Sequence, residues 1–173
     1  FADAAAIERA ADKIDIMETA ERIGIPVPRS IVVKHADQIP NHTIPFPLVV
    51  KPWRSRIRTG KGWASTSVSH AATPMALQRD LHSRAAHEFP VMLQERIEGP
   101  GAGVFACYRN GRPEALFSHR RLRERPPWGG DSVLSESVEL PAGMSDFATR
   151  LLESIGWRGV AMVEFKVDSR DNQ

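Results

Sequence analysis

Apolar side chains recur every three or four positions in three stretches of the chain, and this is the period of an amphipathic helix. The stretches are residues 12–24, 73–89 and 145–156. Each begins with a residue whose side-chain oxygen can accept hydrogen bonds from the first backbone amides of a helix. The pattern therefore predicts three helices, with the N-caps Asp12, Thr73 and Ser145.

Apolar runs that are β-branched or alternate with polar residues fill most of the remaining chain, and such runs are typical of strands. The dipeptide Asn110-Gly111 is the strongest hairpin signal and joins two of these runs. Residues 126–132 read as a loop. The order of the elements predicts an α+β fold with two sheets. The predicted strands are residues 29–35, 46–51, 63–69, 91–95, 103–109, 113–123 and 159–168.

The composition is that of a packed globular protein. The chain has 173 residues, 42% of them hydrophobic, and no apolar run approaches the roughly 18 residues of a membrane span. We therefore expect a cytoplasmic protein with no membrane partner. Cys107 is the only cysteine, and its apolar neighbours predict a small buried side chain. Because the sequence starts at Phe1 and stops at Gln173 in what reads as a hairpin, we expect a piece of a longer chain.

Positive charge is concentrated in residues 51–62, which contain five lysines and arginines and no acidic residue. The net charge of the whole chain is only +2, so this segment predicts an anionic ligand. Nucleic acid is one such ligand, and the sequence pI of about 9.0 admits it. It is not favoured, because the basic residues gather in short loops and the chain has only one tyrosine.

Glu164 is a carboxylate in the middle of an otherwise apolar predicted strand. A buried carboxylate needs a cation, a metal ion or hydrogen-bond donors. One interpretation is a salt bridge to Lys166 or to a nearby arginine. The other is a magnesium site, in which Lys51 and the arginines of residues 119–123 bind the polyphosphate that accompanies the metal.

Five segments in this order resemble the ATP-grasp superfamily, closest to its carboxylate-amine ligase branch, which includes the carbamoyl-phosphate synthase large chain and biotin carboxylase. The resemblance implies two α/β lobes with largely antiparallel sheets that clamp a nucleotide. It divides the chain into an entry helix (1–25), a small lobe (26–90) and a large lobe (91–173) that is incomplete at its C-terminus. The segments are "DKIDIMETAERIGIPVP", "PLVVKP", "RTGKG", "VMLQERIEG" and "GVAMVEFKVD".

The resemblance also implies roles for particular residues. Lys51 would contact the nucleotide phosphates and the adenine region, and Gly60, Lys61 and Gly62 would close over the phosphates. Glu164 would hold Mg²⁺. The remaining candidates are Glu95, Arg96 and Ile97 beside adenine, Glu98 near the ribose, and Arg120, Arg121 or Arg123 against the transferred phosphate or the substrate carboxylate.

The implied reaction uses ATP to convert a carboxylate into an acylphosphate, which an amine then attacks. Its partners are small-molecule carboxylate and amine substrates and the flanking domains of a longer chain, and no side-chain nucleophile is required. Relatives complete the metal site with a glutamate and an asparagine about a dozen residues after the first carboxylate. Gln173 lies nine positions after Glu164, so we expect this piece alone to be inactive. Two alternatives remain open, a non-catalytic nucleotide-binding domain and a basic nucleic-acid-binding module, and the sequence does not indicate an oligomeric state.

Overall fold

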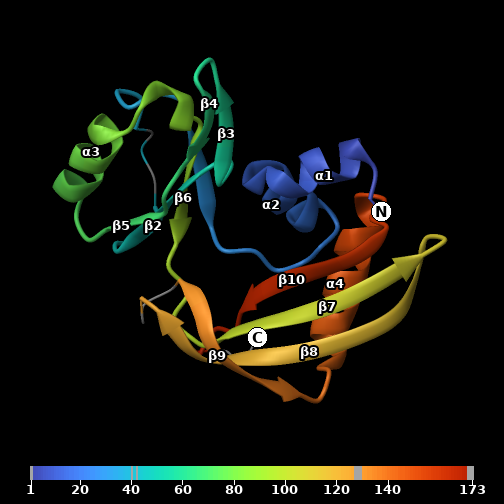
Figure 1. Cartoon of the computed structure of the whole chain (residues 1–173). Helices are drawn as coiled ribbons and strands as arrows, with labels where there is room; N and C mark the ends of the chain where they lie inside the picture. The colour runs from blue at the N-terminus through green and yellow to red at the C-terminus, as the bar shows by residue number, and fades with distance from the viewer. Residues whose placement is uncertain (1, 40, 42, 127–129, 171–173) are drawn as a thin grey trace. The chain divides into compact units, whose positions relative to one another are not determined.

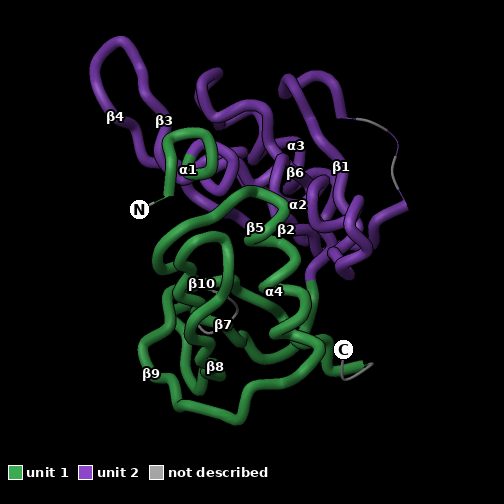
Figure 2. Tube along the Cα trace, turned by 90° about the vertical axis from the view of Figure 1, so that its right-hand side faces the viewer, with its two compact units in different colours: residues 1–7, 97–173 green, residues 8–96 purple. Residues whose placement is uncertain are grey.

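The computed structural model describes residues 2–39, 41, 43–126 and 130–170. The chain forms two compact units, which Figure 2 shows in different colours. We call residues 8–96 the N-unit, and residues 1–7 together with 97–173 the C-unit. No helix of the described residues is both long and apolar enough to cross a bilayer.

The N-unit is built on a four-stranded antiparallel sheet in the order β1-β6-β2-β5. Helix α3 packs on one face of this sheet, where Leu77 and Leu81 meet Leu48, Val50 and Leu93 in the core. A two-stranded hairpin, β3-β4, follows the second strand. The elements are α1 (Ala4–Ala11, which crosses the boundary between the units), α2 (Lys13–Arg22), β1 (Ser30–Val33), β2 (Leu48–Pro52), β3 (Arg56–Thr59), β4 (Gly62–Ser65), β5 (Ser69–Ala71), α3 (Pro74–Ser83), the 3-10 helix η1 (Ala86–Glu88) and β6 (Val91–Glu95).

The C-unit contains a second four-stranded antiparallel sheet, in the order β10-β7-β8-β9. One long helix, α4, lies behind this sheet in Figure 1. The buried side chains Val104, Ala106 and Tyr108 of β7 face it, and the Tyr108 hydroxyl donates to the Thr149 carbonyl at 3.3 Å. The elements are β7 (Gly101–Arg109), β8 (Arg112–Arg125), β9 (Asp131–Val138), α4 (Ala142–Ser154) and β10 (Gly159–Lys166).

The α+β fold with two largely antiparallel sheets is confirmed, and so are several local signals. Asp12 caps α2 by accepting from the backbone amides of the second and third helical residues. Thr73 caps α3, with proline at the first helical position. Asn110 and Gly111 have φ angles of 52° and 76° and form the β7-β8 turn. Short-range hydrogen bonds decide these features, so the sequence predicts them well.

Other predicted boundaries were wrong. Helix α4 begins at Ala142 rather than at Ser145, whose hydroxyl donates to the Ala142 carbonyl at 2.8 Å instead of capping the helix. Helix α3 ends at Ser83, and a separate 3-10 turn follows it. Cys107 is half-buried rather than buried.

Two stretches taken as loops contain strands. The basic segment includes β3 and the turn that leads into β4, and the predicted strand 63–69 is divided between β4 and β5. The predicted loop 126–132 runs into β9, a strand missing from the prediction, whereas residues 127–129 lie outside the described residues. The β9 sequence "DSVLSESV" is mostly polar, so its strand character comes from pairing with β8.

The large lobe was predicted to begin at residue 91. In the structure, residues 91–95 are β6, which lies between β1 and β2 in the sheet of the N-unit. The boundary between the two compact units follows Arg96. Strand β6 therefore belongs, by its hydrogen bonds, with the strand that carries Lys51.

Candidate functional site

Lys51 lies on the face of the N-unit sheet that points away from α3. Side chains alternate along a strand, so the residues flanking Lys51 in β2 point into the core while Lys51 points to the other side. Val49 and, across the register, Met92 and Gln94 of β6 share its face. This face carries polar groups, whereas the α3 face is apolar.

A directional chain of hydrogen bonds holds Lys51 in place. Its ammonium donates to the Gln94 side-chain oxygen at 2.5 Å. The Gln94 amide nitrogen donates to the Ser30 hydroxyl at 3.1 Å, and that hydroxyl donates to the Pro28 carbonyl at 2.9 Å. Gln94 is only 3% exposed, so its amide is a fixed acceptor. Because that acceptor is neutral, it orients the ammonium without cancelling its charge.

His70 of β5 lies on the same sheet face as Lys51. It lies opposite Val49 in the register. Partial burial lowers the pKa of the imidazole below its usual value, and the charges of Arg96 and Lys51 lower it further. Three groups that can be cationic therefore lie close enough to influence one another, and such an arrangement favours a bound anion.

The predicted adenine-side residues lie at and beyond the end of β6. The carboxylate of Glu95 accepts from Nε of Arg29 at 2.9 Å and from Nη2 at 3.3 Å, and its side chain is 13% exposed. Alternation turns Glu95 to the opposite face from Gln94. The Glu98 carbonyl accepts from the Ser169 amide within the C-unit at 2.9 Å. Glu95 thus has a structural partner, and Arg96 is the candidate of this group placed near His70.

The residues predicted to close over phosphates form the turn of the β3-β4 hairpin. Gly62 has a φ of 116°, a value that suits glycine. The Thr59 hydroxyl donates to the Gly62 carbonyl at 2.9 Å and accepts from the Lys61 amide at 3.3 Å. Gly60, Lys61 and Gly62 are all exposed. The turn presents an exposed ammonium beside backbone that no side chain covers.

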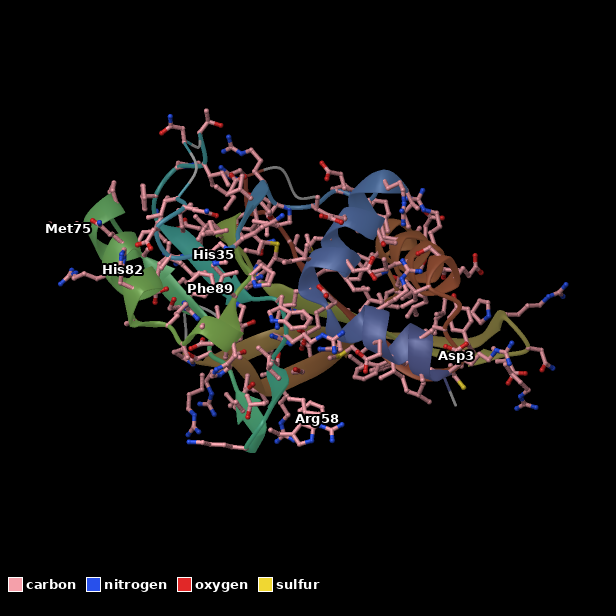
Figure 3. All side chains as sticks on the ribbon, turned by 90° about the horizontal axis from the view of Figure 1, so that it is seen from above. Asp3, His35, Arg58, Met75, His82 and Phe89 are labelled. Atoms are coloured by element: carbon pink, nitrogen blue, oxygen red, sulfur yellow. The ribbon has the colours of Figure 1, made fainter. Side chains whose placement is uncertain are left out.

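One face of this hairpin is basic. Ile57 is buried, whereas Arg56 and Arg58 on either side of it are exposed, and Arg58 lies directly opposite Trp63, which is 70% exposed. Figure 3 labels Arg58 on this hairpin. Within the part of the chain that the structure describes, no carboxylate pairs with Arg56, Arg58 or Lys61. The basic segment therefore keeps part of its positive charge uncompensated.

The C-unit contributes a charged cluster on the sheet face away from α4. Arg121 of β8 forms ion pairs with Glu164 of β10 and with Glu124, the latter at 3.3 Å. Lys166 contacts the second Glu124 oxygen at 3.3 Å. The Arg121 and Glu124 side chains are 14% and 8% exposed. The four groups alternate in sign, so each cation has a carboxylate partner.

Two glycines in β7 make this cluster possible. Gly103 lies between Glu164 and His119 in the register, and Gly101 lies next to Lys166. A Cβ atom on Gly101 would come within 2.7 Å of the Arg121 side chain, and one on Gly103 would come within 2.5 Å of the His119 ring. The bare backbone of β7 therefore lets side chains of β8 reach across toward β10.

The interpretation of Glu164 as a buried charge was wrong, because its side chain is 54% exposed. The face it shares with Lys166 is not covered by α4. Its partner is Arg121, so the salt bridge to a nearby arginine, one of the two interpretations, is present. Among the residues that the structure describes, no three His, Cys, Asp or Glu side chains gather as a metal-binding group.

The three candidate arginines of β8 have different surroundings. Arg121 alone is paired with Glu164. Arg120 is paired with Glu136 of β9, opposite it in the register. Arg123 is exposed, and irregular pairing lies on both sides of it. Lys51 belongs to the N-unit and these residues to the C-unit, so the structure describes each half of the predicted site separately.

Sequence reasoning missed Gln94, Ser30 and His70 as neighbours of Lys51, and it gave His119 and Glu124 no role. The alternation in "VMLQE" could have placed Gln94 on one face of its strand, but its register with β2 spans 43 positions. No local pattern contains that pairing. Gly103, the first residue of a predicted strand, and Gly101 just before it were the available signal for close approach across β7.

No family model matches the chain, and no curated protein matches its sequence. Solved structures do match its fold. An L-amino acid ligase from Bacillus licheniformis has a TM-score of 0.70 at 14% identity, covering 96% of this chain and 39% of the ligase. A D-alanine–D-alanine ligase from Bacillus anthracis complexed with ATP has a TM-score of 0.69 at 19% identity, covering 97% and 55%.

The VanG D-Ala:D-Ser ligase from Enterococcus faecalis has a TM-score of 0.69 at 16% identity, covering 98% of this chain and 52% of that one. This chain therefore spans between two fifths and just over half of the solved ligases it matches. The identities are low, so the likeness concerns the fold. Over almost its whole length, the chain has the ATP-grasp fold that the sequence predicted.

Proposed function

We propose that this chain is the Mg-ATP-binding part of a ligase that joins a carboxylate to an amine. The observation that carries the proposal is Lys51, whose ammonium is oriented by the buried neutral amide of Gln94 on the sheet face opposite α3. The fold shared with solved ligases, one of them complexed with ATP, supports it. The proposed compartment is the cytoplasm, because a chain with one unpaired cysteine suits a reducing environment.

In this proposal Lys51 and Arg96 bind the nucleotide phosphates, and the turn at residues 60–62 closes over them with Lys61 and backbone amides. The end of β6, from Glu95 to Ile97, borders the adenine. Glu98 remains the candidate for the ribose. The charges of Arg96 and Lys51, which add to the effect of burial in lowering the His70 pKa, support the placement of phosphates near Lys51.

Glu164 is the proposed magnesium ligand. Proteins usually hold Mg²⁺ with one or two carboxylates together with substrate phosphates, and Glu164 offers a half-exposed carboxylate. A bound Mg²⁺ would supply charge neutralisation for phosphoryl transfer. Arg121, already at Glu164, is then the arginine best placed to contact the transferred phosphoryl group. Arg120 would act beside it only after leaving Glu136, and the exposed Arg123 is the third candidate.

The reaction proposed for the intact protein has two steps. A carboxylate oxygen of the acid attacks the terminal phosphorus of ATP, which forms an acylphosphate and releases ADP. The amine nitrogen then attacks the acyl carbon, inorganic phosphate leaves, and the nitrogen loses a proton to solvent. Both steps depend on positioning and charge stabilisation by the chain rather than on a side-chain nucleophile.

The test is calorimetric titration of ADP and Mg²⁺ into the intact protein that contains this chain. Lys51→Ala should weaken ADP binding about 10- to 100-fold, because a charge-assisted contact contributes about 1.5–3 kcal/mol. Lys34→Ala, at an exposed lysine that follows β1, is the matched control and should bind like the wild type. Absence of ADP binding by the wild type, or an unchanged affinity in Lys51→Ala, would refute the proposal.

A second candidate function is binding of single-stranded nucleic acid. One observation favours it, the exposed Trp63 directly opposite Arg58 on a hairpin with further uncompensated cations. That function predicts oligonucleotide binding that weakens steeply with salt and does not compete with Mg-ATP. Competition by Mg-ATP for the hairpin would instead favour the ligase proposal.

A further inference from the structure

An apolar strip adjoins the charged cluster of the C-unit. One row of the sheet contains Glu164, Gly103 and His119, and the next row on the same face contains Met162, Phe105 and Phe117. We call these last three residues the apolar strip. They lie on the three neighbouring strands β10, β7 and β8, so they form a line across the sheet.

The apolar strip is open, although its members are large. Met162, Phe105 and Phe117 are 40%, 38% and 50% exposed, whereas Val104 and Ala106, on the α4 face of β7, are 0% and 2% exposed. Helix α4 therefore covers one face of the sheet and leaves this one uncovered. A contiguous exposed apolar surface on a protein of this size commonly marks a binding site.

The aromatic surface continues from the apolar strip to His119, in the neighbouring row that contains Glu164 and Gly103. The ring centroids of Phe117 and Phe105 are 6.0 Å apart, and those of Phe105 and His119 are 5.3 Å apart. His119 packs over Gly103, where a Cβ atom would collide with its ring. Both aromatic contacts have tilted geometry in the range favourable for ring pairs. One surface thus joins the apolar strip to the imidazole of His119, which lies in the row of Glu164.

His119 is 8% exposed, and its Nδ1 is buried with no hydrogen-bond partner among the described residues. A neutral imidazole has one N–H donor, and placing its proton on Nε2 leaves no buried N–H without an acceptor at Nδ1. The Nε2–H group is then a donor for a ligand. Arg121 supplies a second donor on the same face, where it now pairs with Glu164.

We propose that the apolar strip selects the acid substrate, and that this acid is a small carboxylate with an aromatic or branched apolar side chain. The side chain lies on Met162, Phe105 and Phe117, and the carboxylate points toward His119 and Arg121. This inference rests on the proposed ligase function. We infer such an acid because the two rows are continuous. A ligand with an apolar end and an anionic end can contact the apolar strip and the donors of His119 and Arg121 at the same time.

The experiment compares 3-phenylpropionate with propionate as calorimetric ligands of the intact protein, each with and without saturating ADP and Mg²⁺. ADP binding is measured separately in every variant. The wild type should bind 3-phenylpropionate at least about tenfold more tightly than propionate, a ratio typical of an added apolar group in a fitting pocket. Phe117→Ala should remove most of that preference without changing ADP affinity.

Two further variants separate the parts of the inference. His119→Phe keeps a ring over Gly103 but removes the nitrogen donor, so it should weaken both acids by a similar factor of about ten. Leu134→Ala, at a 51% exposed residue of β9 outside the apolar strip, is the matched control and should behave like the wild type. Thermal unfolding of each variant checks that the fold is kept. Phe117 is half-exposed, so its replacement by alanine should disturb the fold least.

The outcomes are distinct. A preference for 3-phenylpropionate that Phe117→Ala abolishes supports the inference. Equal binding of the two acids, an unchanged preference in Phe117→Ala, or failure of both acids to bind a protein that binds ADP overturns the inference and leaves the proposed function intact. Failure of ADP to bind overturns the proposed function, whatever the acids do.

Discussion

The two units hold their principal cations in opposite ways. In the N-unit, Lys51 donates to the neutral side chain of Gln94 at 2.5 Å. In the C-unit, Arg121 is paired with the carboxylates of Glu164 and Glu124. The neutral side chain of Gln94 does not cancel the charge of Lys51, whereas the two carboxylates oppose that of Arg121. The comparison indicates that the N-unit is prepared for an anion, while Arg121 is free for one only after Glu164 takes another partner.

The largest effect on the C-unit should follow from removing Arg121. In Arg121→Gln, the Glu124 carboxylate, 8% exposed, keeps only the contact with Lys166 at 3.3 Å. Loss of a partner by a largely buried charge should lower the free energy of unfolding by about 1–3 kcal/mol. Chemical denaturation measures this change.

The neighbouring arginine provides the control. Arg120→Gln breaks a pair whose side chains are 59% and 41% exposed, and an exposed pair contributes only about 0–1 kcal/mol. Equal destabilisation by the two variants would mean that the cluster on the Glu164 face is not more stabilising than an ordinary surface ion pair.

Gln94→Glu would place a carboxylate beside Lys51, as the C-unit places carboxylates beside Arg121. The new carboxylate would pair with Lys51, cancel its charge and repel the nucleotide phosphates. Under the proposed function, ADP affinity should fall about tenfold, or about 1.4 kcal/mol, in calorimetric titration. Gln38→Glu adds the same charge at an exposed position of the N-unit. If both variants bind ADP equally well, the neutrality of the Lys51 acceptor is unimportant.

Gly103→Ala tests whether the C-unit cluster depends on the bare backbone of β7. The added Cβ would lie 2.5 Å from the His119 ring, so the ring must shift, and we expect a loss of about 1 kcal/mol in unfolding free energy, at the lower end of the range for overpacking. Gly143→Ala meets nothing within 4 Å and lies within α4. There the substitution should be neutral or stabilising, so an equal loss in both would contradict the packing explanation.

The sequence predicted the parts of this molecule that short-range interactions determine. Asp12, Thr73 and the Asn110-Gly111 turn act within a few residues, and the structure shows each where it was expected. The alternation of β10 also put Glu164 and Lys166 on one face correctly. The order of the segments was enough to predict the ATP-grasp fold.

Features that depend on strand pairing were missed. Strand β9 has little apolar pattern of its own and is defined by its ladder with β8. Alternation assigns Glu164 to a face, but only the position of α4 decides which face is covered, and this is why a half-exposed carboxylate was expected to be buried. Gln94 reaches Lys51 and Ser30 through registers that join β6 to two distant strands.

The smallest effect, and the most specific to the N-unit, concerns the titration of His70. Its folded-state pKa is lowered from 6.5 by burial and by the charges of Arg96 and Lys51. The unfolded chain therefore binds a proton at His70 more readily than the folded chain. The sign follows: stability is unaffected by His70 above pH 6.5 and falls as the pH drops from 6.5 toward the folded-state pKa.

Nuclear magnetic resonance of the His70 ring measures this directly. If phosphates bind beside Lys51 and Arg96, their negative charge should offset both cations, so the His70 pKa should rise toward its usual value when ADP is added. His82, an exposed histidine of α3 that contacts Asp37 at 3.1 Å, is the internal control, and ADP should leave its ring signals unchanged. A His70 pKa that stays low in the ADP complex would place the phosphates away from the Lys51 face, even if ADP binds elsewhere on the protein.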